Sequence, residues 1–228
     1  MGWLAGKTGY DVVDEKIEKI EQEIANRVYR LWLKPEGETT IVFMDDKPPI
    51  IEDHQLKIGD SWQNWFTCLE VLGQPCIACA GDKAYTAAFY SILELVEFNT
   101  KDSTHVVNPL RVLCAKFQLM KQLKAESKLR GGLRGCMYTV GRSDGSAANT
   151  GDEWTFVRKL SDEELSALNK DAQPVDWETY LAPKSPEELA VIMGKAEDKD
   201  TARGGNSRGG SSAPRGGQVA YKEDEVNF

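Results

Sequence analysis

Three cysteines and one histidine that lie close together constrain this chain more than any other feature. His54, Cys68, Cys76 and Cys79 fall within 26 residues, and the last two form a Cys-X-X-Cys pair. A structural zinc ion takes four Cys or His ligands in a tetrahedron, and a Cys-X-X-Cys turn lets two thiolates reach one ion. The spacing therefore predicts one structural zinc ion, held in a knuckle of about residues 50–82.

Other interpretations of these residues stay open at this level. Cys68 lies in an apolar stretch and could be a buried core thiol, and His54 could be an ordinary loop residue. His105 or Cys114 could then supply the fourth ligand. A redox Cys-X-X-Cys pair is a further alternative, but such pairs normally open a helix in a βαβ unit. Here the following segment, residues 85–98, is predicted to be a strand instead.

Length and composition indicate one domain of ordinary size with appendages. The chain has 228 residues, 41% of them hydrophobic, and a formal net charge of −8. It has no run of 18 apolar residues, and the start Met1–Lys7 lacks the apolar region of a signal peptide, so we expect a cytoplasmic protein that does not enter a membrane. Five cysteines, an odd number, fit a reducing compartment, with Cys114 and Cys136 as core thiols.

Short runs rich in β-branched and aromatic residues predict a mainly β fold with helical additions, an α+β chain. The predicted strands are residues 28–33, 39–44, 61–68, 85–98, 136–140 and 153–160. A turn at residues 35–38 would join the first two strands as a hairpin, and residues 61–68 and 85–98 would flank the zinc knuckle. A long basic helix is predicted from Asn108 to about Arg130. Together these elements suggest an OB-like Greek-key barrel over residues 28–160, with the helix across its mouth or along its groove.

The segments outside this core differ in character. Within residues 1–27, apolar residues recur at helical spacing from Val13 onward, which predicts an amphipathic helix that packs on its own domain or on a neighbouring protomer. Residues 161–195 carry two capping-box patterns and should form peripheral helices. Residues 196–228 are almost free of apolar residues, contain three Arg-Gly-Gly units and end in an acidic tip, which predicts a disordered linker and tail.

Positive charge is concentrated in one part of this acidic chain. Residues 101–142 hold nine Lys or Arg but only Asp102 and Glu126 as acidic residues. The local field decides whether a surface attracts nucleic acid, so this segment could bind phosphates despite the net charge. A solvated helix face is the alternative.

These features resemble a known family. The segment Arg30–Pro35 with Thr40–Phe43, followed by His54 and the three cysteines in the same order, is similar to the zinc-containing single-stranded DNA-binding proteins of tailed bacteriophages over roughly residues 27–160. The resemblance implies an OB-fold that protects single-stranded DNA during phage DNA replication, recombination and repair, with one zinc held by His54, Cys68, Cys76 and Cys79. It also implies a location in the host cell cytoplasm.

The resemblance further implies an acidic tail that recruits replication and recombination proteins. The tip of this chain, with Glu223, Asp224, Glu225, Val226 and Phe228, matches that pattern in form rather than in sequence. In that family a basic N-terminal segment supports cooperative binding, but residues 1–27 here are acidic, so cooperativity is not carried over and self-association on single-stranded DNA stays open.

A binder of single strands needs cations along the phosphates and aromatic faces on which bases stack. The predicted DNA contacts combine basic residues with three favoured aromatic stackers: Arg30, Lys34, Trp62, Lys83, Tyr90, Arg111, Lys116, Lys121, Lys124, Lys128, Arg130, Arg134, Tyr138 and Arg142. Trp32, Trp65, Phe89 and Trp154 are further candidates for stacking, although about half of such residues must face the core. We expect binding that tolerates any base sequence.

Two other classes of function compete with this interpretation. An adaptor protein with a structural zinc ion would bind only proteins, through its tail and N-terminal helix. A zinc-dependent nucleic-acid enzyme is the least favoured, because four Cys and His ligands close the metal shell. The chain also has no Walker loop, His-Glu-X-X-His or Gly-X-Ser-X-Gly motif. We therefore expect no catalytic residues.

Overall fold

The computed structural model describes residues 13–14, 17, 28–58, 61–100, 103–170 and 172–201, and only the backbone of residues 58, 61–64 and 194–201. The acidic tail lies outside these residues, and so does most of the predicted N-terminal helix. Val13 and Ile17, two members of its apolar stripe, are described as helical and are 51% and 46% exposed.

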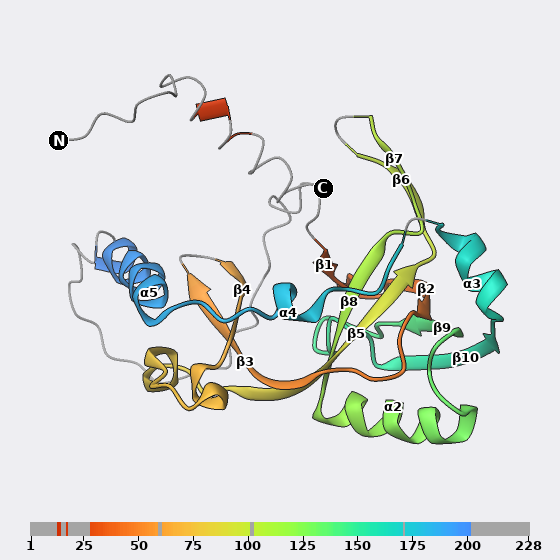
Figure 1. Cartoon of the computed structure of the whole chain (residues 1–228), viewed down its shortest axis with the longest axis horizontal. Coiled ribbons are helices and arrows are strands. Elements are labelled where there is room, and N and C mark those ends of the chain that lie inside the picture. Colours follow the sequence, from red (N-terminus) through yellow and green to blue (C-terminus); the bar gives the residue numbers. More distant parts are fainter. Residues whose placement is uncertain are drawn as a thin grey trace, which may run out of the picture.

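An eight-stranded sheet forms the body of the molecule (Figure 1). Its strands are β1 (Tyr29–Arg30), β2 (Glu38–Phe43), β3 (Ile50–Ile58), β4 (Ser61–Thr67), β5 (Tyr85–Glu94), β8 (Leu110–Lys116), β9 (Cys136–Gly141) and β10 (Glu153–Lys159). The main path runs β1-β8-β5-β2-β9-β10, and β3 branches from β5 and carries β4. Strands β6 (Glu97–Asn99) and β7 (His105–Val107) form a separate hairpin.

Helices surround this sheet on several sides. They are α2 (Phe117–Arg130), α3 (Asp162–Leu168), α4 (Trp177–Tyr180) and α5 (Pro186–Thr201), with the 3₁₀ helices η1 (Leu69–Leu72) and η2 (Ile77–Ala80) in the loop after β4. Helix α2 ends at Gly131, whose φ of 65° is the left-handed conformation that glycine adopts at low cost. None of the described helices is long and apolar enough to cross a membrane.

Alternation along β5 places its neighbouring side chains on opposite faces of the sheet. Tyr90 belongs to the core cluster that α2 covers through Leu123, whereas Phe89 belongs to a second cluster with Val175 and the partly buried Trp177. Because both faces are covered here, β8 has four consecutive buried residues. A strand buried on both faces lacks the alternating pattern by which strands are usually found in a sequence.

That absence explains one error of the sequence analysis. The predicted helix from Asn108 to Arg130 is a helix only from Phe117, because residues 110–116 form the buried strand β8. The predicted strand over residues 85–98 ends at Glu94, and β3 was missed altogether. By contrast, β4, β9, β10 and the capping boxes before α3 and α5 confirm the expectations for those segments.

The predicted topology is also corrected by the pairing of the strands. The expected hairpin over residues 28–44 does not form, since β1 pairs with β8 in parallel and β2 pairs with β5 and β9. The closed barrel is wrong as well, because the path of paired strands ends at β1 on one side and at β10 on the other. The fold is mixed, with most of its strands in one large open sheet and few helices.

Candidate metal centre and charged surface

The four predicted metal ligands come together at the end of the β3–β4 arm. His54 lies on β3, Cys68 directly follows β4, and Cys76 and Cys79 lie at the start of η2 and within it. Antiparallel pairing of the two strands sets His54 opposite Phe66, two residues before Cys68. The four ligand atoms lie within 4.8 Å of one another.

Their spacing fits a single tetrahedral ion. The His54 Nε2 atom lies 3.6 Å from the Cys76 Sγ atom and 3.5 Å from the Cys79 Sγ atom, and the Cys68 and Cys79 Sγ atoms are 3.5 Å apart. Metal–ligand bonds of about 2.0–2.3 Å in a tetrahedron place the ligand atoms roughly 3.5–3.8 Å apart. These three edges therefore match the shell that one metal ion with nitrogen and sulfur ligands requires.

The surroundings of the cluster support metal binding. The side chain of His54 is fully buried, and its Nδ1 atom lies 3.4 Å from the Asp82 Oδ2 atom. A carboxylate at this position orients the imidazole so that Nε2 can face a metal. Burial by itself would raise the pKa of the Cys76 thiol, but backbone hydrogen bonds from Leu69, Cys79 and Ala78 outweigh it and lower this pKa to about 7. The Cys76 thiolate is thus favoured, whereas burial and hydrogen bonds with Cys68 raise the pKa of the Cys79 thiol, so a metal ion would have to displace that proton.

Apolar side chains close the cluster against solvent. Leu56, Leu69 and Ala78 pack around the cysteines, and Leu189 of α5, which is 1% exposed, covers them. The alternative ligands lie elsewhere: His105 is on β7, where it contacts Glu97, and Cys114 is in the cluster beneath α4. Among the described residues, only His54 and the three cysteines form a group that could hold a metal ion.

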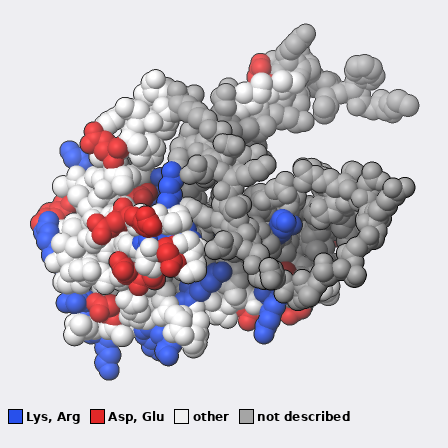
Figure 2. Space-filling model, turned by 180° about the vertical axis from the view of Figure 1, so that it is seen from behind, with Lys and Arg blue, Asp and Glu red and all other residues white. Residues whose placement is uncertain are grey.

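The predicted lysine contacts all lie at the surface. Lys34, Lys83, Lys116, Lys121, Lys124 and Lys128 are exposed. Three of them, Lys121, Lys124 and Lys128, line α2, at the bottom of Figure 1. Figure 2, which shows the opposite side, has acidic side chains gathered in the middle of the described face and many of the basic ones along its lower edge.

The predicted arginine contacts are instead held by protein groups. Arg30, Arg111, Arg130 and Arg134 form ion pairs with Asp53, Glu94, Glu126 and Asp162, respectively. Arg142 is buried and donates to the backbone carbonyl oxygens of Leu33, Gly145 and Ala147, so it holds a loop and is not free for DNA. The structure therefore does not present this predicted contact residue to DNA.

Two of the three favoured stackers are buried and present no ring face to solvent in this structure. Tyr90 and Tyr138 are 4% and 2% exposed, and both rings contact Phe43 edge to face in the core. The Tyr138 hydroxyl donates a 2.9 Å hydrogen bond to Glu126, which satisfies its polar end inside the protein. The side chain of Trp62 lies outside the described residues, as do the tail residues Glu223, Asp224, Glu225, Val226 and Phe228.

Sequence reasoning missed a buried ion pair beside the metal cluster. The Arg30 Nη2 atom donates to the Asp53 Oδ2 atom at 2.9 Å, and the Tyr85 hydroxyl donates to the same oxygen at 3.0 Å. The guanidinium lies 4.5 Å from the centre of the Trp65 ring. Burial acts to lower the pKa of the Arg30 guanidinium, but the Asp53 carboxylate together with Cys114, Tyr180 and Tyr85 outweighs burial, so the pKa is raised. Asp53 directly precedes the candidate ligand His54 on β3, and because this strand was not predicted, the sequence analysis had no alternation pattern to place the two side chains on opposite faces.

Comparison with known proteins found no matching family model and no matching curated protein. The candidate sites therefore rest on the residues and geometry described above.

Proposed function

We propose that this chain is a sequence-tolerant single-stranded DNA-binding protein whose β3–β4 arm is held by one structural zinc ion. The observation that carries the proposal is the contrast between its lysines and arginines. Every ion pair found among the described residues uses an arginine or a histidine, and none uses a lysine. Lys159 donates to carbonyl oxygens at the end of α2, but Lys121, Lys124 and Lys128 have no ion pair among the described residues and remain available for phosphates.

A row of such charges suits a flexible polyanion better than a compact protein partner. Lys121, Lys124 and Lys128 project from one helix, and Lys116 lies directly before it, 4.1 Å from the centre of the Tyr85 ring. Phosphates that bind such lysines release condensed counterions, which supplies affinity without reading bases. The acidic side chains in the middle of the face in Figure 2 would repel the phosphates of single-stranded DNA. The DNA would therefore be confined to the surface that carries the lysines.

The donor set supports zinc as the metal. Three thiolates and one imidazole are soft or borderline ligands that select zinc over calcium or magnesium. Four protein ligands fill a tetrahedral shell, and the apolar cover of Leu56, Leu69 and Leu189 keeps substrates away. We propose a structural role for the ion and no enzymatic activity for the chain.

The proposal extends to the partners of the chain. The acidic tail, ending at Phe228, would recruit replication and recombination proteins and would compete with DNA for the basic surface. The protein would act in phage DNA replication, recombination and repair in the host cytoplasm, and copies would associate along a strand.

The test is fluorescence anisotropy of a labelled single-stranded oligonucleotide at several salt concentrations, with duplex DNA as competitor. We expect single-strand-selective binding that weakens with salt, with a log–log slope near −0.7 for each phosphate contact. Replacing Lys121, Lys124 and Lys128 with alanine should make the slope shallower by about 2, because three contacts are lost.

The control replaces two exposed lysines on other elements: Lys57 on β3 and Lys170 after α3. Its slope should equal that of the wild type. Absence of binding at low salt, even after removal of residues 220–228, would reject the proposal in favour of the protein-only adaptor. Release of shortened oligonucleotides would instead favour a nucleic-acid enzyme.

A further inference from the structure

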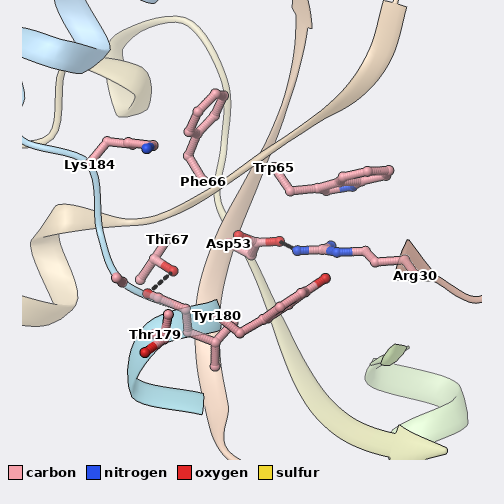
Figure 3. A pocket seen from close by; sticks show the side chains of 10 residues that line it. Arg30, Asp53, Trp65, Phe66, Thr67, Thr179, Tyr180 and Lys184 are labelled. Carbon is pink, nitrogen blue, oxygen red and sulfur yellow. Dashed lines mark hydrogen bonds and ion pairs between the residues drawn. The ribbon is translucent and has the colours of Figure 1, made fainter. Parts of the chain in front are cut away.

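A cavity of about 210 Å³ opens between the metal arm and the segment that links α4 to α5 (Figure 3). Its walls include Arg30 of β1, Asp53 of β3, Trp65 and Thr67 of β4, Tyr180 of α4 and Lys184. In Figure 3, Trp65 and Arg30 lie on one side, Lys184 lies on the opposite side and Tyr180 lies below. The cavity thus combines aromatic rings, a planar cation and a flexible lysine.

One wall of the cavity is held rigidly. Arg30 is fixed by its ion pair with Asp53, which is itself held by the Tyr85 hydroxyl. The guanidinium stacks on the Trp65 ring at 4.5 Å and lies 5.1 Å from the centre of the Phe89 ring. A side chain held in this way loses little conformational freedom when a flat ligand packs against it.

The other wall is the segment 179–184, which lies across the arm. The Thr67 hydroxyl donates a 2.9 Å hydrogen bond to the Leu181 carbonyl oxygen. The Tyr180 ring contacts Trp177 edge to face at 6.0 Å, so it is supported from behind. Lys184 is exposed and has no ion pair with any residue that the structure describes. Its ammonium group is therefore available to an anion at the cavity.

We propose that this cavity takes a single unpaired base of the bound strand, with its phosphate on Lys184. The inference rests on the proposed DNA binding and identifies where one nucleotide is held. Drug-sized ligands need about 300–1,000 Å³, so a smaller cavity suits one ring system rather than a longer stretch of strand. Every base has a π face that stacks on aromatic rings, so this site would be sequence-tolerant.

The same geometry would exclude duplex DNA. A paired base is stacked and hydrogen-bonded inside the helix, and it must be unpaired and extruded before it can enter a closed site. For a base that is already unpaired, the free-energy cost of entering the cavity is much smaller. The cavity would therefore add selectivity for single strands, which the lysines alone cannot provide because duplex DNA also presents phosphates.

The direct test uses the full-length protein and an oligonucleotide in which each thymine in turn is replaced by a photoreactive 4-thiothymine. Irradiation should attach one nucleotide to the peptides that contain Trp65 or Tyr180, as identified by mass spectrometry. Attachment confined to other peptides would overturn the proposal.

Two substitutions test the energetics. Tyr180→Leu keeps an apolar contact with Trp177 but removes the stacking ring, so it should weaken binding about 5- to 150-fold with little change of salt slope. Lys184→Ala, at an exposed site that folding does not require, should make the slope shallower by about 0.7. The matched controls are Phe98→Leu, which removes a partly exposed ring on the separate β6–β7 hairpin, and Lys170→Ala.

The outcomes separate this inference from the proposed function. If the wild type binds and both cavity variants bind as tightly as their controls, the proposed base site is wrong. The proposed DNA binding would then still stand. No binding by the wild type would reject the proposed function itself. Circular dichroism and metal content, measured on each variant, show whether a loss of binding reflects the cavity or the fold.

Discussion

The core beneath α2 and the metal arm are stabilised in different ways. In the core, Phe43 is fully buried and contacts Tyr90 and Tyr138 edge to face at 5.3 and 5.8 Å. In the arm, the loop after β4 has only η1 and η2, four residues each, and its buried cluster consists partly of the metal-binding cysteines. The core has enough apolar surface to fold by burial, whereas the loop of the arm, under the proposed zinc binding, would need an ion.

This difference shows how one chain can combine two sources of stability. Burial of large aromatic side chains stabilises the sheet without any ligand. A metal ion can replace a hydrophobic core where a segment is too short to build one. With the proposed zinc ion in place, the arm would depend on metal supply and thiol oxidation in a way that the sheet does not.

Removing a metal ligand should have the largest effect. We expect Cys76→Ser to abolish metal binding and to unfold the loop, because structural zinc contributes on the order of 10 kcal/mol to the folding of small zinc domains. Hydrogen exchange should become fast in residues 68–82 and at Leu189, but not in β9. Cys136→Ser is the control, since Cys136 is a buried thiol outside the cluster. If residues 68–82 were as well protected from hydrogen exchange without metal as with it, the loop would not depend on an ion.

Truncating the centre of the core should come next. Phe43→Ala should lower the free energy of unfolding by about 3–5 kcal/mol, because it leaves a cavity among aromatic rings. Urea denaturation measures this loss, and metal content under native conditions should stay unchanged. Phe117→Ala, at a ring that is 60% exposed, should cost well under 1 kcal/mol. Loss of metal from the Phe43 variant would show that the two regions are not independent.

A smaller effect is expected where segment 179–184 meets the arm. Thr67→Val keeps the shape of the side chain but removes its hydrogen bond to the Leu181 carbonyl, at a cost of about 0.5–1.5 kcal/mol. Hydrogen exchange should increase in residues 179–184 and remain the same in β9. Thr155→Val, at an exposed position of β10, is the matched control. Unchanged exchange in segment 179–184 would mean that other contacts hold it.

The smallest effect should be a pH dependence that originates in the sheet. Burial raises the pKa of Asp45 above its usual 3.8, and its Oδ1 atom has no hydrogen-bond partner among the described residues. The folded state thus holds this proton more tightly than the unfolded state, so stability falls as pH rises from about 3.8 through the raised pKa. Asp45→Asn should remove this slope in urea denaturation.

Asp144 provides a control of opposite sign for that experiment. Hydrogen bonds from Ser146 lower the pKa of this exposed carboxylate, so its contribution is present at neutral pH and is lost as pH falls. Asp144→Asn should therefore reduce stability more at neutral pH than in acid. Equal pH profiles for the wild type and the Asp45 variant would exclude Asp45 as the source.

Prediction from sequence succeeded where the signal is local. The spacing of the cysteines located the metal cluster, and the capping boxes at Ser161 and Ser185 located two helix starts. Prediction from sequence failed where contacts between distant parts of the chain decide the secondary structure or the burial of a residue. The basic segment looked like one helix because the apolar residues of β8, buried on both faces, also fit a helical period. Tyr90 and Tyr138 looked like binding residues because a sequence does not show which face of a strand is covered.

The parallel pairing of β1 has a consequence for the order of folding. Tyr29 lies opposite Arg111, so this edge strand cannot pair until most of the sheet has been synthesised. Contacts between residues so distant in sequence form slowly, because the intervening loop must first be closed. We expect the ion pair between Arg30 and Asp53, and the cavity beside it, to be completed late. A nascent chain would then carry its basic helix before it has a finished binding pocket.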